Sequence, residues 1–138
     1  MVHGGAVSWT SHKQTTVAHS SSDAEYMALS DASREAIART QFFQELKIPF
    51  PMPITIFSDS ETALAIANGT AINHRKSKHI DIKYHAVRHY INEDKVQVNH
   101  IAGINNIADL FTKPLGPQVH QRLVSAMGMR NSYEVIRR

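Results

Sequence analysis

The chain has 138 residues and a formal net charge of +3. This length indicates one domain, and the mildly basic charge permits nucleic acid as a partner without requiring it. Cysteine is absent, which excludes disulfides and thiolate metal sites and leads us to expect an intracellular protein, in the cytoplasm or nucleus. No apolar run approaches the roughly 18 residues of a membrane-spanning helix, and the first residues do not have the pattern of a secretion signal. We therefore expect no membrane partner.

The first half of the chain predicts a long helix between two strands. Residues 6–11 partly alternate between apolar and polar side chains, which favours a short strand. Ser22 and Glu25 have the spacing of a capping box, and the helix that they begin is predicted to reach Leu46. Prolines at positions 49, 51 and 53 end this helix. The β-branched run Ile54–Phe57 then predicts the second strand.

Asp59 follows this second strand, at the point where a further helix begins. Ser58 or Ser60 can cap that helix, which is predicted to end at Asn68-Gly69. Chemistry in α/β sheets gathers at the carboxyl ends of strands, so Asp59 is a candidate metal ligand or general base. Aspartate is also among the best helix-capping residues. The position alone leaves both roles open.

The second half of the chain predicts a basic loop and four further elements. The loop covers His74–His79, a helix Ile80–Asn92, a strand Lys95–Ile101, and two short helices Ile104–Thr112 and Gln118–Met127. The resulting order of strands and helices is typical of a layered α/β domain whose strands run mostly parallel. We expect this domain over residues 1–127 and a loose C-terminal tail over residues 128–138.

Three acidic residues stand at the ends of predicted elements: Glu25, Asp59 and Asp109. Carboxylate oxygens are the ligands that Mg²⁺ and Mn²⁺ prefer. Two such ions about 4 Å apart can activate a water and stabilise the leaving oxygen in phosphodiester hydrolysis. Each residue also has a structural alternative, because Glu25 can complete the capping box, Asp59 can cap a helix, and Asp109 can complement a helix dipole. The spacing alone does not decide between these roles.

Two groups of histidines and basic residues are further candidates. His85 and His89 are four residues apart on a predicted helix, a spacing that zinc sites use, but neither an HExxH motif nor a cysteine accompanies them. The cations of the basic loop favour contact with nucleic-acid phosphates, and a solvated loop is the structural alternative. The candidate nucleic-acid-binding residues are Arg75, Lys76, Lys78 and His79.

Four stretches of the sequence together resemble a known family. They read AVSWTSHKQTTVAHSSSDAEYMALSDASREA, IFSDSETALAIA, KSKHIDIKYHAVRHYI and NIADLFTKPL. In this order they resemble the ribonuclease H domain of Ty1/copia-type retrotransposon polyproteins, over most of the chain from about Gly5 to Leu115. The segments KHIDIKYH and ADLFTKPL are the most specific to that family.

The resemblance implies a ribonuclease H-like α/β fold and two divalent ions, Mg²⁺ or Mn²⁺. It implies an enzyme that hydrolyses the RNA strand of RNA/DNA hybrids. The catalytic metal ligands that it implies are Glu25, Asp59 and Asp109. These are the same three carboxylates that stand at element ends.

The sequence departs from the family pattern at its start. The family's domain begins earlier, with a central strand that carries a first metal-binding aspartate and then a second strand, whereas no acidic residue precedes Asp23 here. We therefore expect a ribonuclease H-like fold that lacks the first central strand and most of the second. Nuclease activity is expected to be impaired by the loss of one of four metal-binding carboxylates. Asp23 or Asp81 could in principle substitute for it.

Two structural outcomes follow from a shortened sheet. Residues 6–11 could pair in parallel with residues 54–58 in a three-stranded sheet, or two chains could pair as a homodimer through the truncated sheet. We expect the homodimer, because a three-stranded sheet would leave apolar helix faces bare. The rival functional hypothesis is a non-catalytic, domesticated module that binds nucleic acid or protein.

Overall fold

The computed structural model describes residues 5–6, 8–11, 20–70 and 78–129, and for residues 78–84 it describes the backbone alone. The chain divides into two units, one of residues 14–101 and the other of residues 1–13 together with 102–138. Each unit is described by itself below.

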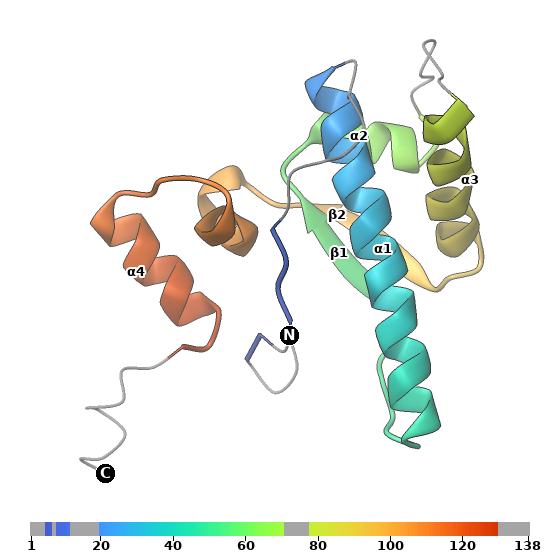
Figure 1. Cartoon of the computed structure of the whole chain (residues 1–138), viewed down its shortest axis with the longest axis horizontal. Helices are drawn as coiled ribbons and strands as arrows, with labels where there is room; N and C mark the ends of the chain where they lie inside the picture. Colours follow the sequence, from blue (N-terminus) through green and yellow to red (C-terminus); the bar gives the residue numbers. More distant parts are fainter. Residues whose placement is uncertain (1–4, 7, 12–19, 71–77, 130–138) are drawn as a thin grey trace. The chain divides into compact units, whose positions relative to one another are not determined.

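Strands and helices alternate in the unit of residues 14–101 (Figure 1). Its elements are α1 (Ser21–Glu45), β1 (Ile54–Ser58), α2 (Glu61–Ala67), α3 (Lys78–Asn92) and β2 (Val96–His100). The two strands pair in parallel, with Ile54 opposite Val96 and Ser58 opposite His100. Parallel neighbours need a crossover connection, which α2 and α3 supply. The predicted α/β class with parallel strands is therefore confirmed.

The core of this unit joins all five elements. Val87 of α3 and Val96 of β2 are almost completely buried, as is Tyr26 of α1. The buried cluster consists of Tyr26, Leu29, Ala63, Leu64, Ile66, Ala67, Val87, Val96 and Val98. Two of its α2 members are alanines, whose small side chains let neighbouring helices approach closely. The first turns of α1 thus pack against α2, and Figure 1 shows both at the end of the unit toward which β1 points.

The start of α1 differs from the predicted capping box. The N-cap is Ser20, which has an extended backbone and whose hydroxyl accepts a hydrogen bond from the Asp23 backbone N–H at 3.1 Å. Ser22 lies inside the helix, so the capping box of Ser22 and Glu25 is wrong. The Ser20 hydroxyl already satisfies one of the unpaired N–H groups of the first turn. Glu25 is therefore not part of a capping box at this helix start.

The second unit contains η1 (Gly103–Asn105), η2 (Ile107–Phe111) and α4 (Pro117–Ala126). The single helix predicted over Ile104–Thr112 is therefore wrong, since two short 3-10 helices take its place. Asn106 separates them, because its backbone is extended and its side-chain oxygen accepts a hydrogen bond from the Ala108 N–H at 3.2 Å. The predicted helix over Gln118–Met127 is confirmed as α4 to within about a residue.

The strand predicted over residues 6–11 does not form in the part of this segment that the structure describes. The Ala6 N–H donates to the Met127 carbonyl at 3.2 Å, while residues 8–11 are exposed and have no regular secondary structure. Among the described residues the sheet has two strands, so the three-stranded alternative is wrong. The homodimer stays a prediction. None of the described helices is both long and apolar enough to cross a membrane.

Candidate active site

The parallel pairing of β1 with β2 places the carboxyl ends of both strands at one edge. The ladder runs to Ser58 opposite His100, and the Ile101 N–H extends it by donating to the Ser58 carbonyl at 3.0 Å. β-Branched residues fill most of β1, which suits a pleated, packed strand. Asp59 comes directly after this edge, as the sequence predicted. It is half-buried there.

Two serines cap the helix that follows Asp59. The Ser60 hydroxyl accepts a hydrogen bond from the Ala63 N–H at 3.2 Å and makes Ser60 the N-cap of α2. The Ser58 hydroxyl accepts one from the Ser60 N–H, also at 3.2 Å. The alternative in which Asp59 is the helix cap is therefore wrong. The Asp59 carboxylate stands at the strand end without carrying out this structural task.

Replacing Ser60 by alanine is expected to lower the free energy of unfolding by about 1 kcal/mol, because the Ala63 N–H loses its acceptor. Ser60→Asp is the matched control, since an aspartate at the same position keeps an acceptor oxygen and is expected to stay close to the parent. Urea denaturation of the three proteins measures both effects. Equal stability of Ser60→Ala and the parent would contradict the assigned cap.

Glu25 lies near the start of α1, in the same unit as Asp59. Its side chain is exposed, whereas the next residue, Tyr26, is buried against the core. The first turns of α1, to which Glu25 belongs, lie at the end of the unit toward which β1 points (Figure 1). Asp59 directly follows β1 at this end.

Asp109 belongs to the other unit and is buried, with 8% of its surface exposed. It lies in η2, and the Lys113 ammonium contacts both of its carboxylate oxygens, Oδ1 at 2.9 Å and Oδ2 at 3.0 Å. The Lys113 backbone N–H also donates to the Asp109 carbonyl at 3.0 Å. A carboxylate that is largely removed from water needs such a positive partner.

The three candidate ligands are divided between the two units, and their convergence stays a prediction. Within either unit, the described residues bring no three His, Asp or Glu side chains together as a metal site. The donor chemistry nevertheless fits a hard divalent cation, because all three side chains offer carboxylate oxygens. Asp109 in addition already holds a cation at both oxygens, which shows that its surroundings accept positive charge.

The structure describes only some of the other residues that the sequence indicated as candidates. Asp23, a candidate substitute for a further carboxylate, is buried in the first turn of α1. Arg75 and Lys76 lie outside the described residues, and only the backbone is described for Lys78, His79 and Asp81, at the start of α3. Sequence reasoning missed Lys113, although its spacing of four residues from Asp109 is one at which side chains on a helix meet.

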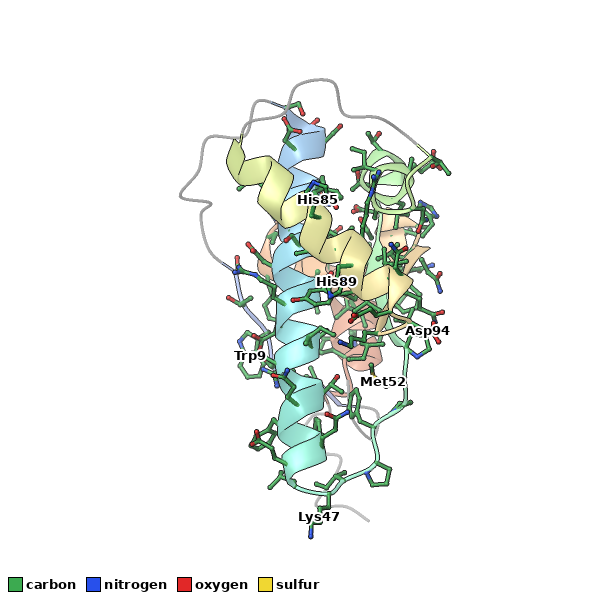
Figure 2. All side chains as sticks on the ribbon, turned by 90° about the vertical axis from the view of Figure 1, so that its right-hand side faces the viewer. Trp9, Lys47, Met52, His85, His89 and Asp94 are labelled. Atoms are coloured by element: carbon green, nitrogen blue, oxygen red, sulfur yellow. The ribbon has the colours of Figure 1, made fainter. Side chains whose placement is uncertain are left out.

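The two histidines with zinc-like spacing project from α3 one turn apart (Figure 2). His85 is exposed, and His89 lies 3.3 Å from a Glu93 carboxylate oxygen. A hydrogen bond from Lys95 lowers the pKa of Glu93, and the nearby charge of His89 acts in the same direction. In the described part of α3 and its surroundings these histidines form no group of three metal ligands. His89 thus belongs to an exposed ion-pair network with Glu93 and Lys95.

The geometry defines an α/β protein with a carboxylate at the end of a parallel strand and a second near the start of the helix packed beside it. The comparisons with known proteins give the family. The chain is 31% identical over 129 residues to the retrovirus-related Pol polyprotein from transposon TNT 1-94 of Nicotiana tabacum, covering 94% of this chain and 10% of that one. Over about nine-tenths of its length the chain is homologous to Ty1/copia-type retrovirus-related Pol polyproteins.

Two further relatives agree. The Pol polyproteins from transposons RE1 and RE2 of Arabidopsis thaliana are 32% and 30% identical over 123 residues, which are 89% of this chain and 8% of each polyprotein. The chain thus spans about a tenth or less of the length of the relatives that it matches. No protein-family model matches it, and no solved structure matches it at a significant level.

Proposed function

We propose that this domain is the ribonuclease H unit of a copia-type polyprotein and hydrolyses the RNA strand of RNA/DNA hybrids with Mg²⁺ or Mn²⁺. The observation that carries the proposal is the position of Asp59. It follows the carboxyl end of a parallel strand in an α/β unit, while Ser60 caps the next helix. The relationship to Pol polyproteins supports the same reading.

The proposed fold is ribonuclease H-like. The support for it is the parallel pairing of β1 with β2, their helical crossover and the packing of α1 against the same core. The family pattern includes a further metal-binding aspartate, and the sequence holds no acidic residue before Asp23. We therefore expect cleavage by this chain to be slower than cleavage by a domain with all four carboxylates.

In this proposal Glu25, Asp59 and Asp109 hold the metal. A bound divalent ion supplies Lewis acidity and activates water. The chain's own contribution is to orient negative oxygens from different elements, with Asp59 fixed by the end of β1 and Glu25 by the first turns of α1. Asp109 belongs to the other unit, where η2 keeps it largely shielded from water. Incubation of the chain with a hybrid labelled on its RNA strand tests the proposal directly.

The basic segment of residues 74–79 is proposed to bind the phosphates of the hybrid through Arg75, Lys76, Lys78 and His79. Its last two residues belong to the first turn of α3 and not to the predicted loop. Changing Arg75 and Lys76 together to glutamine is expected to weaken hybrid binding at low salt by roughly tenfold and to flatten its salt dependence, because fewer counterions are released. Fluorescence anisotropy of a labelled hybrid at several salt concentrations measures both quantities.

The matched control for the loop removes two other positive charges. Arg34 and Arg39 are paired with Asp31 and Glu35 along α1, and changing both arginines to glutamine leaves the loop unaltered. This variant is expected to bind the hybrid nearly as the parent does. An equal loss in both double variants would mean that net charge alone, and not the loop, determines binding.

A second candidate function is that of a non-catalytic, domesticated module that binds nucleic acid or protein. In this candidate two copies of the chain can pair as a homodimer. The observation in its favour is that large apolar side chains are exposed in the unit of residues 14–101. Phe57 of β1 is 56% exposed and Phe42 of α1 is 57% exposed. Exposed apolar side chains mark protein contacts where they form a contiguous patch. Hybrid binding without any cleavage would favour this candidate over the nuclease.

A further inference from the structure

Lys113 and Asp109 form a pair whose two members differ in exposure. The lysine side chain is 53% exposed, and the aspartate side chain only 12%. The carboxylate thus belongs to the interior of its unit, whereas the cation reaches it from solvent. Lysine carries its charge on a flexible four-carbon stem with many rotamers. The cation can therefore leave while the carboxylate stays in place.

Local backbone hydrogen bonds fix the carboxylate end of the pair. The Asp109 N–H donates to the Asn106 carbonyl at 3.2 Å, and the Asp109 carbonyl accepts from the N–H groups of Thr112 and Lys113 at 3.2 and 3.0 Å. Asn106 in turn caps η2. These bonds hold the backbone of Asp109 independently of the ammonium group, so losing the ion pair does not by itself release the turn.

We propose that Lys113 is a displaceable counter-cation for Asp109: it occupies the carboxylate when no metal is bound and leaves when a divalent ion binds there. This inference rests on the proposed function, because it requires Asp109 to be a metal ligand. Lys113 is a positioning residue and not a ligand. It neutralises and orients the buried Asp109 carboxylate, and it would compete with a divalent ion for that carboxylate.

Competition predicts opposite effects for two substitutions. Lys113→Met removes the competing charge, keeps an unbranched side chain, and is expected to bind Mn²⁺ about fivefold more tightly than the parent, which corresponds to removal of a pair worth about 1 kcal/mol. Lys113→Arg supplies a planar fork that grips a carboxylate through two hydrogen bonds. It is expected to bind Mn²⁺ more weakly than the parent.

The experiment measures Mn²⁺ affinity by calorimetry on the full chain, beside Asp109→Asn, which should lose most of the binding. Thermal unfolding with and without Mn²⁺ shows that each variant is folded and is a second readout, since Mn²⁺ should raise the Tm of Lys113→Met more than that of the parent. A lysine with only a structural role would lower the Tm without tightening metal binding. Unchanged or weaker Mn²⁺ affinity in Lys113→Met overturns the proposal.

The outcomes also separate this inference from the nuclease proposal. If the parent cleaves hybrids but Mn²⁺ affinity does not respond to residue 113, only the counter-cation role fails. If the parent cleaves nothing while Lys113→Met still binds Mn²⁺ more tightly, the nuclease fails and the counter-cation role stands. Absence of Mn²⁺ binding in the parent and in Lys113→Met overturns the counter-cation role outright.

Discussion

Replacing Asp59 by asparagine is expected to reduce cleavage of the RNA strand of a hybrid by at least about 100-fold, the scale on which removal of one charge-stabilising group acts in enzymes. The substitution keeps the shape of the side chain and removes one negative charge from the metal-binding set. In the proposed site Asp59 directly follows the end of β1. Hybrid binding should be much less affected, because the phosphate contacts are proposed to come from residues 74–79.

The matched control for this variant is Asp94→Asn. Asp94 is exposed, follows α3 and has a positive φ of 54° (Figure 2), a backbone conformation that asparagine also adopts readily. The same chemical change there is expected to leave cleavage at the level of the parent. Initial rates with Mg²⁺ and with Mn²⁺, measured beside the Tm of each protein, complete the comparison. Cleavage by Asp59→Asn at the parent's rate would remove Asp59 from the site.

The largest expected effect on stability is that of Leu29→Ala. Leu29 is 4% exposed and belongs to the core cluster that joins α1 with α2, α3 and the strands. Truncating a buried leucine costs about 2–5 kcal/mol, from lost burial and from the cavity left behind. Marginally stable domains of this size have only about 5–15 kcal/mol in total, so the variant is expected to be partly unfolded at moderate temperature.

Leu46→Ala is the control for the core prediction, since it makes the same change just after the end of α1 at a side chain that is 52% exposed. Its cost is expected to stay below about 1 kcal/mol, as for other surface positions. Urea midpoints of the two variants and the parent measure the difference. Similar losses in both variants would contradict the assigned core and would indicate that the end of α1 is covered in solution.

The helical stripe of α1 could be predicted because its spacing is local information. The residues at helical spacing are Tyr26, Leu29, Ser33, Ala36, Ile37, Thr40 and Phe43. Tyr26, Leu29, Ser33 and Thr40 are buried, and the other three are half-buried. The first residue of the helix could not be predicted in the same way. Three consecutive serines, at positions 20–22, are equally good caps, so the local sequence does not single out Ser20.

The position of Asp59 could likewise be predicted, since a β-branched run followed by a small helix-forming segment fixes the strand end. The sequence could not predict that Ser60 and not Asp59 is the N-cap of α2, because Ser58, Asp59 and Ser60 are all residue types that cap helices. The burial of Asp109 was also outside the reach of local patterns. It arises from the packing of η2 with α4, and the sequence had predicted one continuous helix in place of η1 and η2.

The most direct test of the central claim is cleavage by the unaltered chain of a hybrid labelled on the RNA strand, first with Mg²⁺ and then with Mn²⁺. Labelled double-stranded RNA and double-stranded DNA are run beside it. The account predicts slow, metal-dependent cleavage of the RNA strand in the hybrid alone, which stops when the metal is chelated. Absence of hybrid cleavage with either ion, in a chain that is folded and binds the hybrid, would contradict it.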